Sequence, residues 1–387
     1  MSEHNRIKVL HIAPTPFFSD RGCHIRILGM LRGLQASGIR NLLCTYHHGR
    51  EVNGIDSIRI GEIKRYQKTT AGPHPLKYWA DLKLLVLALK TTWNERPDIL
   101  HGHLHEGAIL AWLCRIMLFW RRIPVVADIQ GSLVGELSTF GYFGKAGWIR
   151  SLFQFIEKIV TRLPTALTCS SPASYRMLLE SFNVPAKNLL LAEDGLDQKM
   201  VFKQRAPLQP DQPVTLVYTG SLLPGKGLHE LLEVLKIVLT DHAQSKALII
   251  GYPVEQTRES LQDAGLLERC QLTGRQSYFD LPDYLAKADI ALEPKRADAG
   301  EGSGKVINYM AAALPVVCFD TDNNRNFFKD HALLASDTAA FAANISALID
   351  DHNRIHAIGQ QNLEQVTRLY DWNRVATDIC TLYHRLT

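Results

Sequence analysis

Short apolar runs alternate with amphipathic stretches along the chain. Residues 7–13 form a compact apolar run that ends at Pro14, as expected for a strand buried on both faces of a parallel sheet. An amphipathic stretch over 25–36 follows and stops at Ser37 and Gly38, and a second apolar run covers 41–46. This order predicts a β-α-β opening with a right-handed crossover.

The same alternation continues on both sides of one break. Between 194 and 213, Gln, Pro and charged residues dominate and the apolar periodicity disappears. Before the break the pattern predicts helices over 80–93 and 108–120 and strands over 98–102 and 124–128. Beyond it the pattern predicts strands over 214–218, 247–250, 269–272, 290–292 and 316–319, and helices over 228–239, 281–288 and 306–312. The expected fold class is therefore α/β, with two doubly wound parallel sheets.

Length and composition fit this prediction. A chain of 387 residues, 46% hydrophobic and 21% charged, suits two globular α/β domains. No apolar run reaches the roughly 20 residues of a membrane-spanning helix, and the nearest, 108–120, is interrupted by Arg115. The first residues lack the order of a signal peptide, and the seven cysteines are scattered without a CxxC pair. These features predict a cytoplasmic protein with reduced thiols and neither a disulfide framework nor a zinc site.

Charge is distributed unevenly along the chain. Residues 1–185 contain 23 Lys and Arg against 13 Asp and Glu, a net charge of +10, whereas the remainder has 20 against 26, a net charge of −6. The two halves are expected to face different partners, with chance drift as the alternative. Basic–aromatic patches lie in the first half at 64–66, 77–79, 119–122 and 140–148. Such patches suit an anionic membrane surface, and solvated or nucleotide-facing positions are the alternative.

One loop follows the first strand of each predicted domain, at 15–22 in the first domain and at 220–227 in the second. In an open parallel sheet, ligands collect at the carboxyl ends of strands, where helix N-termini present free N–H groups. In the second loop Gly220, Gly225 and Gly227 permit close backbone approach, and Lys226 supplies a cation for a diphosphate. The spacing matches neither GxxxxGK[ST] nor GxGxxG. A phosphate site and a tight structural turn therefore both stay open.

A polar turn from Glu301 to Lys305 runs directly into the predicted helix at 306–312. Its successive backbone N–H groups are suited to form an anion-binding nest, and Lys305 adds positive charge. A carboxylate beside such a nest is better suited to sugar hydroxyls than to phosphate, which makes Glu301 a candidate for sugar binding. A solvated loop with ordinary helix capping is the alternative.

Five segments carry a resemblance to a known family. EGSGKVINYMAAALPVV (301–317) resembles the donor-site segment of the retaining GT-B glycosyltransferases of family 4. The segments AEDGLD, YTGSLLPGKGLHELLEVL, LTGRQSYFDLPDYLAKADIALEP and YDWNRVATDICTLY match further family elements in the same order. The resemblance implies a GT-B fold, in which two Rossmann-like domains face a central cleft. It implies an acceptor-side domain over 1–195, a donor domain over 196–370, and a helix over 371–387 that crosses back onto the first domain.

The resemblance also implies the site residues. Glu301 corresponds to the glutamate that contacts the donor sugar, and Lys226 to the lysine that neutralises the diphosphate; with Asp128 they are the catalytic candidates. Cations and helix N-termini hold the pyrophosphate in this family, so no metal is required. The donor-binding candidates are Gly22, Gly220, Ser221, Lys226, Arg275, Glu301, Gly302, Ser303, Gly304, Lys305, Val306 and Asn308.

In the first domain the acceptor side is expected at three strand ends. Asp128 is predicted to orient an acceptor hydroxyl, unless it caps a helix, and the loop around Arg21 suits an anion, unless it is a surface turn. His101, His103 and His105 alternate after a strand, which favours lining of a cleft over binding of zinc. The acceptor-binding candidates are Arg21, His24, His105 and Gln130.

Three positions depart from the family pattern. The second family glutamate falls on Asn308, seven positions after Glu301 instead of eight, or the alignment slides to Tyr309. Ser221 replaces an arginine and Ala313 a glycine. Asparagine can still hydrogen-bond the ribose diol, so donor binding is expected. The departures leave open a non-catalytic donor-binding partner subunit, whereas an epimerase is disfavoured because the carboxylates it needs are not evident.

The implied activity is transfer of a sugar from a nucleoside-diphosphate sugar, with retention of the anomeric configuration. The acceptor is expected to be a saccharide or a lipid-linked precursor of a cell-envelope glycan. Neither a cofactor, a metal nor a nucleic-acid partner is expected. The predicted location is cytoplasmic, peripheral on the inner face of the cell membrane.

Overall fold

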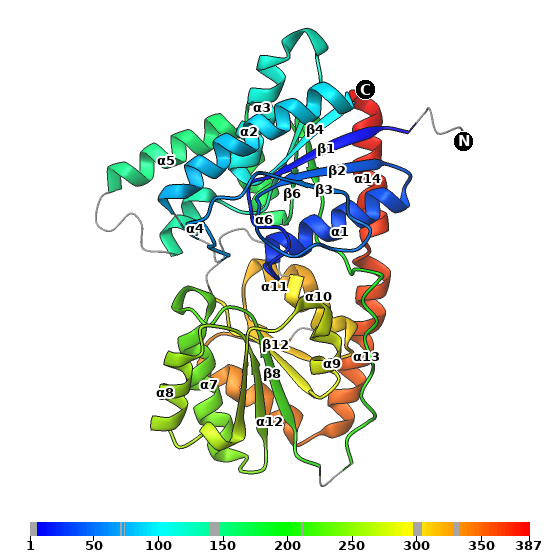
Figure 1. Cartoon of the computed structure of the whole chain (residues 1–387). Helices are drawn as coiled ribbons and strands as arrows, with labels where there is room; N and C mark the ends of the chain where they lie inside the picture. The colour runs from blue at the N-terminus through cyan, green and yellow to red at the C-terminus, as the bar shows by residue number, and fades with distance from the viewer. Residues whose placement is uncertain are drawn as a thin grey trace. The chain divides into compact units, whose positions relative to one another are not determined.

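The computed structural model describes residues 6–69, 72, 74–139, 147–209, 212–296, 304–328 and 333–387. The chain divides into two compact units, each built on its own sheet (Figure 1). The first unit holds the described residues up to Asp194 together with the C-terminal stretch from Trp372, and the second holds the described residues from Gly195 to Asp371.

The first unit contains a seven-stranded parallel sheet in the order β3-β2-β1-β4-β5-β6-β7. Its inner strands are buried on both faces, which explains why they form continuous apolar runs. The strands are β1 (Lys8–Ala13), β2 (Arg40–Thr45), β3 (Ser57–Arg59), β4 (Ile99–His103), β5 (Val125–Ile129), β6 (Ala166–Cys169) and β7 (Leu189–Leu191).

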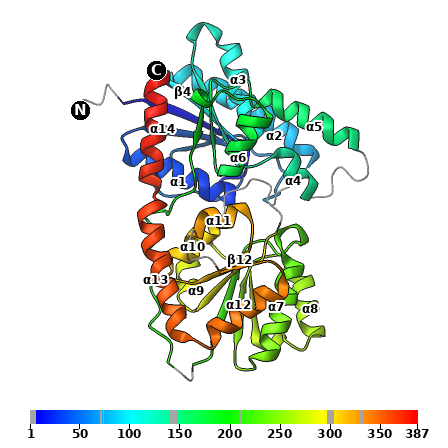
Figure 2. The same cartoon turned by 180° about the vertical axis from the view of Figure 1, so that it is seen from behind.

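Helices cover both faces of this sheet (Figures 1 and 2). Along β5 the side chain of Val126 packs in the core shared with α1 and α14, whereas its neighbour Val125 packs in the core shared with α2 and α3. Ala127 lies on the latter side with Val160 of α5. The helices are α1 (Gly22–Ala36), α2 (Pro75–Glu95), α3 (Leu104–Met117), α4 (Leu133–Thr139), α5 (Gly147–Val160), α6 (Pro172–Arg176) and α14 (Trp372–Leu386), with short turns η2 (Phe119–Arg121), η3 (Met177–Ser181) and η4 (Ala186–Asn188).

The C-terminal helix α14 packs closely against α1. A Cβ atom on Gly29 would lie 2.0 Å from Nε1 of Trp372, and one on Gly33 would lie 2.6 Å from the Trp372 carbonyl oxygen. Glycine at these two positions therefore lets the start of α14 approach the backbone of α1. Farther along α14, Ala376 and Tyr383 complete the core on this face of the sheet.

The second unit contains a six-stranded parallel sheet in the order β10-β9-β8-β11-β12-β13. Its strands are β8 (Thr215–Thr219), β9 (Lys246–Ile250), β10 (Cys270–Gly274), β11 (Ile290–Glu293), β12 (Val316–Phe319) and β13 (Leu333–Ala335). Its helices are α7 (Leu228–Asp241), α8 (Glu255–Asp263), α9 (Leu281–Leu285), α10 (Gly304–Ala311), α11 (Asp322–Phe328), α12 (Thr338–Ile349) and α13 (His352–Leu369), with turns η5 (Pro224–Lys226), η6 (Leu267–Arg269) and η7 (Tyr278–Asp280).

One core cluster fills the space between this second sheet and the helices α7 and α12. Among the remaining helices of the second unit, α10 packs against α13. The predicted fold class is confirmed, because each unit is a doubly wound α/β layer with a fully parallel sheet. Strand order reverses between β1 and β4 in the first unit and between β8 and β11 in the second, and ligands of such sheets bind at these switch points.

Candidate functional site

The loop between β8 and α7 touches the loop that follows β11. Gly220 has a φ of +139° and Gly227 a φ of +87°, conformations that favour glycine. A Cβ atom on Gly227 would lie 2.4 Å from the carbonyl oxygen of Pro294. The sequence separates these loops by about 70 residues, and the sheet order brings them together at the switch point of the second unit.

A lysine–glutamate pair joins α10 to the end of β11. Nζ of Lys305 is 2.7 Å from Oε2 of Glu293, the last residue of β11, whose side chain is only 2% exposed. The same Nζ lies 4.7 Å from the ring centroid of Tyr218. Burial, followed by the nearby Glu293 carboxylate, raises the pKa of Tyr218, so the phenol stays neutral and donates to the carbonyl of Ser221 at 3.0 Å.

Tyr309 links α10 to the end of β8. Its hydroxyl accepts a hydrogen bond from the backbone N–H of Thr219 at 2.7 Å and lies 3.0 Å from the Thr219 Oγ1. Its side chain is fully buried, and this burial is the main cause that raises the pKa of Tyr309. From the sequence, Tyr309 was only the alternative position for the second family glutamate. Its hydroxyl instead holds the helix against the strand that precedes Gly220.

The other donor-binding candidates in the second unit are placed unequally. Lys226 ends η5 and Gly304 begins α10, both at the carboxyl edge of the sheet, while the guanidinium of Arg275 stacks 5.3 Å from the Tyr252 ring centroid. Val306 is fully buried, so its side chain belongs to the core and only its backbone can meet a ligand. Asn308 is 5% exposed.

Three further candidates, Glu301, Gly302 and Ser303, lie outside the described residues. The first turn of α10 begins directly after them. Its first backbone N–H groups have no intrahelical acceptor, because a helix leaves four such donors at its N-terminus. The end of β8, the turn η5 and the start of α10 therefore place Lys226, Lys305 and backbone N–H groups that have no intrahelical acceptor at one edge of the second sheet.

In the first unit, Asp128 is committed to a buried ion pair. Arg26 donates from Nε and Nη2 to its two carboxylate oxygens at 2.9 and 2.6 Å, and Thr168 donates at 2.8 Å. Burial opposes the charge, but the guanidinium and the facing His103 ring hold the pKa of Asp128 well below its usual range. Arg26 also donates to Asp194 at 2.7 Å. The described geometry thus gives Asp128 a structural partner rather than an open carboxylate or a helix cap.

Two other acceptor-side candidates, His24 and Gln130, form hydrogen bonds within the first unit. The backbone N–H of Ser19 donates to Nδ1 of His24 at 2.8 Å, so Nε2 carries the proton and faces the Thr15 hydroxyl at 2.5 Å. His24 is fully buried and holds the loop after β1 in place. Gln130 is partly exposed and donates to Asp128 at 3.0 Å.

His105 lies near a buried carboxylate at the start of α4. Its Nε2 is 3.3 Å from Oε1 of Glu157, which also accepts from the backbone N–H of Leu133 at 2.8 Å. Burial raises the pKa of Glu157, but the His105 contact and the backbone donors of α4 outweigh it and lower the pKa. His105 therefore helps anchor α4, while Arg21 and Gly22 remain at the start of α1.

The alternating histidines do not line a surface. The rings of His101 and His103 are fully buried and stack with a centroid separation of 4.8 Å, with His11 packed beside both. Nδ1 of His101 lies 2.5 Å from the hydroxyl of Tyr383 in α14. The interpretation of these two histidines as cleft-lining residues is wrong. Among the described residues, no group of three or more His, Cys, Asp and Glu side chains is arranged to hold a metal ion.

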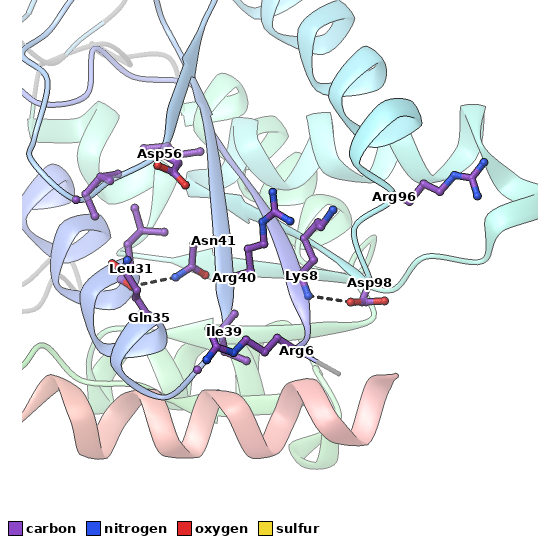
Figure 3. A pocket seen from close by; sticks show the side chains of 14 residues that line it. Arg6, Lys8, Leu31, Gln35, Ile39, Arg40, Asn41, Asp56, Arg96 and Asp98 are labelled. Atoms are coloured by element: carbon purple, nitrogen blue, oxygen red, sulfur yellow. Dashed lines mark hydrogen bonds between the residues drawn. The ribbon is translucent and has the colours of Figure 1, made fainter. Parts of the chain in front are cut away.

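A cavity of about 610 Å³ opens at the opposite, amino-terminal edge of the first sheet (Figure 3). Lys8 and Arg40 begin β1 and β2 there, and the backbone N–H of Lys8 donates to the Asp98 carboxylate at 2.8 Å. The Lys8 ammonium also pairs with Glu95. Within the first unit, this cavity lies at the opposite edge of the sheet from the acceptor-side candidates Arg21 and Gln130.

Two family models match the chain in succession. The model of the glycosyl transferase 4-like domain matches residues 21–193, and the model of glycosyl transferases group 1 matches residues 201–365. The glycogen synthase of Mycobacterium tuberculosis is 23% identical over 317 residues, which cover 79% of this chain and 72% of that protein. The capsular polysaccharide biosynthesis glycosyltransferase CapM of Staphylococcus aureus is 21% identical over 348 residues, 84% of this chain and 87% of that one.

Solved structures share the fold at low identity. The sucrose-phosphate synthase of Thermosynechococcus elongatus gives a TM-score of 0.79 at 17% identity and covers 98% of this chain and 99% of that one. The catalytic domain of starch synthase IV from Arabidopsis thaliana, solved with ADP and acarbose, gives 0.72 at 13% identity, with coverages of 98% and 99%. These likenesses define the class as a GT-B fold. With both family models matched, the chain belongs to the group 1 glycosyltransferases.

Proposed function

We propose that this glycosyltransferase uses a nucleoside-diphosphate sugar as donor, retains the anomeric configuration and needs no metal ion. The observation that carries the proposal is the gathering of Lys226, Lys305 and the start of α10 at the switch point of the second sheet. Lysine side chains and the backbone N–H groups of a helix N-terminus on one edge match the chemistry of a diphosphate. ADP in the structure of starch synthase IV supports the same ligand class.

Positive charge at this edge is expected to act on the diphosphate. Glu293 balances the ammonium of Lys305 at 2.7 Å, so that pair adds little net charge to the site. Lys226 is expected to supply positive charge that meets the diphosphate. This interaction strengthens as the bond to the sugar breaks and negative charge builds on the leaving group, so it stabilises the transition state more than the bound substrate.

We propose same-face attack for the chemical step. The acceptor oxygen bonds to the anomeric carbon while the bond to the leaving phosphate breaks, and a phosphate oxygen takes the acceptor proton. Glu301 would contact the sugar hydroxyls, and the protein would act by positioning and electrostatic stabilisation. The commitment of Asp128 to Arg26 is consistent with a phosphate oxygen, rather than that carboxylate, as the base.

The proposed acceptor is a saccharide or a lipid-linked precursor of a cell-envelope glycan. The named relative CapM acts in capsular polysaccharide biosynthesis, which supports an envelope glycan. In the first unit Arg21 and Gln130 remain partly exposed near the carboxyl edge of the sheet. They are the side chains of the acceptor-side set that are best placed to meet a sugar.

The activity is tested with a panel of UDP-, GDP- and ADP-sugars. We expect one donor class to bind saturably and to be hydrolysed slowly without acceptor, because the leaving-group site acts on water as well. Proton NMR of the sugar released or transferred, recorded before mutarotation, reports the anomeric configuration. Saturable binding without hydrolysis or transfer to any saccharide would contradict an enzyme and favour a donor-binding subunit. Inverted product would contradict retention alone.

Chelators are expected to leave activity unchanged. The chain contains one DxD motif, Asp320-Thr321-Asp322, of the kind that holds a metal in other glycosyltransferases. Both carboxylate oxygens of Asp320 accept hydrogen bonds from Arg325, at 2.5 and 2.6 Å, which competes with metal binding. The measurement is the initial rate in EDTA, with and without added manganese or magnesium. A loss in EDTA that either ion restores would contradict the prediction.

A further inference from the structure

Exposed hydrophobic side chains concentrate on one helix layer of the first unit. The described residues expose 17 large hydrophobic side chains, of which 14 lie on α2, α3, η2 and α5 and three in the second unit. We call the 14 the apolar helix face: Tyr78, Trp79, Leu82, Val86, Trp93, Ile116, Met117, Phe119, Trp120, Trp148, Leu152, Phe155, Ile156 and Ile159. Single exposed hydrophobics are normal on a protein surface, but a large contiguous patch marks an interaction site.

Helix α5 presents its apolar stripe to solvent. Residues 148, 152, 155, 156 and 159 recur at helical spacing and are all exposed, with Trp148 at 71% and Phe155 at 61%. On the opposite side Glu157 and Val160 are buried against the unit. An ordinary surface helix turns its apolar stripe inward, so the stripe of α5 is oriented for a partner outside the described fold.

Helix α2 shows the same division. Ala80, Leu84 and Ala88 are buried in the core, while Trp79 and Val86 face outward. The rings of Trp93 and Trp120 meet edge to face with a centroid separation of 6.4 Å, which joins α2 to η2. Helix α3 packs between α2 and α5 (Figure 1). The exposed side chains therefore belong to one layer of adjacent helices.

Positive charge accompanies the apolar helix face. The elements α2, α3, η2 and α5 carry Lys or Arg at seven positions and Asp or Glu at four, a net charge of +3. The guanidinium of Arg121 lies 4.7 Å from the ring centroid of Trp93, and Arg150 is exposed between Trp148 and Leu152 on α5. Of the four acidic groups, Glu157 is buried.

We propose that the apolar helix face docks on an anionic membrane surface. Tryptophan and tyrosine rings favour the headgroup level, and an exposed apolar helix stripe favours the boundary with the acyl chains. Each cation near an anionic leaflet adds attraction, which distinguishes this surface from a neutral apolar interface. The docking uses side chains of the first unit alone and does not depend on the donor assignment. Its purpose, delivery of a lipid-linked acceptor, rests on the proposed function.

The structure changes which basic–aromatic patches belong to this surface. Tyr66 is only 4% exposed, so the patch at 64–66 does not contribute an aromatic ring. The patches at 77–79 and 119–122 lie on the apolar helix face. Of the patch at 140–148, residues 140–146 lie outside the described residues, and Trp148 begins the stripe of α5. Among the described residues no helix is long and apolar enough to cross a bilayer.

The test is co-sedimentation of the full chain with vesicles of neutral phosphatidylcholine or with about a third anionic phosphatidylglycerol. We expect at least about tenfold stronger partition to anionic vesicles at low salt, reduced at high salt, because a few cations suffice for that difference. Brominated lipids should quench tryptophan fluorescence, since four of the six tryptophans lie on the apolar helix face. Equal partition to both vesicle types at low salt would overturn the proposal.

Variants locate the docking surface. The double variant Trp148→Glu with Phe155→Glu should weaken partition by about tenfold or more, because two large apolar side chains no longer enter the interface. Both residues are exposed, so an unchanged melting temperature separates lost docking from lost folding. The matched control is Ile237→Glu, an exposed hydrophobic residue on α7 of the second unit, which should bind vesicles like the wild type.

Two outcomes of the variant experiment count against the membrane. Unchanged partition of a folded double variant would overturn the assignment to this face. A concentration-dependent dimer in light scattering that the double variant abolishes, without anionic vesicle binding, would assign the face to a second copy of the chain. Donor binding in solution, measured in parallel, is expected to be the same for all three proteins. Failure of the donor assignment would therefore be visible separately from failure of membrane docking.

Discussion

Lys226→Ala is expected to lower kcat/KM by more than tenfold while the fold stays intact. Lys226 ends η5 on the edge of the second sheet where the donor diphosphate is proposed to bind. Loss of Lys226 removes a cation that is proposed to meet the leaving diphosphate. A tenfold loss corresponds to about 1.4 kcal/mol of transition-state stabilisation. Both a weaker apparent donor affinity and a lower kcat are expected.

Two matched variants sharpen this measurement. Lys226→Arg keeps the charge and should recover part of the activity, although a guanidinium differs from an ammonium in shape. Lys236→Ala removes an exposed lysine from the middle of α7 and should leave kcat/KM unchanged. If Lys226→Ala kept more than about a tenth of the wild-type kcat/KM, the assignment of the diphosphate site would be wrong.

Glu301→Ala is expected to abolish transfer for a different reason. Glu301 is predicted to hold the donor sugar, so its loss should affect turnover more than nucleotide affinity. Binding of the free nucleoside diphosphate, measured by calorimetry, should stay close to wild type. A variant that transfers sugar at more than about a tenth of the wild-type kcat/KM would remove Glu301 from the site.

The alternation of apolar runs was sufficient to predict most strands and several helices. β8 and α7 were expected over 214–218 and 228–239, and the structure has them at Thr215–Thr219 and Leu228–Asp241. Parallel strands buried on both faces and helices with one buried stripe leave the clearest patterns. Helix α5 was missed although its apolar residues recur at helical spacing, a signal that the sequence carries; what the sequence could not show is that this stripe faces solvent. The strands β3 and β7 have three residues each and leave no periodicity to detect.

The contacts within the site were less predictable. Lys305 was a candidate site residue, but the sequence pattern gave no indication of its ion pair with Glu293 at the end of β11. Tyr309 meets Thr219 across 90 positions, a contact that only the strand order creates. Arg26 did leave a signal that was missed: it stands among apolar residues on the buried stripe of α1. A charge at a core position requires a buried counter-ion. That requirement would have suggested a buried carboxylate, such as Asp128, as the partner of Arg26.

Asp128→Asn is expected to destabilise the protein by about 3–5 kcal/mol, the typical result of removing one partner from a buried ion pair. The exposed fraction of the Arg26 side chain is 3% and that of Asp128 is zero, so the guanidinium would lose its bidentate charge partner in a buried site and keep only the single ion pair with Asp194. Asparagine still accepts one hydrogen bond but provides no charge. Urea unfolding followed by tryptophan fluorescence is suited to the measurement, because Trp372 lies 5.7 Å from the Arg26 guanidinium.

Two other carboxylates provide controls for this variant. Asp194 also accepts from Arg26, but burial raises its pKa despite that contact, so Asp194→Asn should cost less than Asp128→Asn. Asp283→Asn breaks an exposed pair with Lys203 and should leave the urea midpoint unchanged. Equal losses for Asp128→Asn and Asp194→Asn would contradict the assignment of Asp128 as the dominant partner of Arg26.

The pH dependence of the Asp128 effect follows from the direction of its pKa shift. The folded-state pKa of Asp128 lies well below the value of about 4 that aspartate has in an unfolded chain. The stabilisation is therefore fully present above that unfolded value and is lost only as pH falls through the lower folded value. Across pH 5–8, the difference in unfolding free energy between wild type and Asp128→Asn should be constant, and it should shrink only in strong acid. A slope across pH 5–8 would contradict this assignment of the stabilisation to the ionised Asp128 carboxylate.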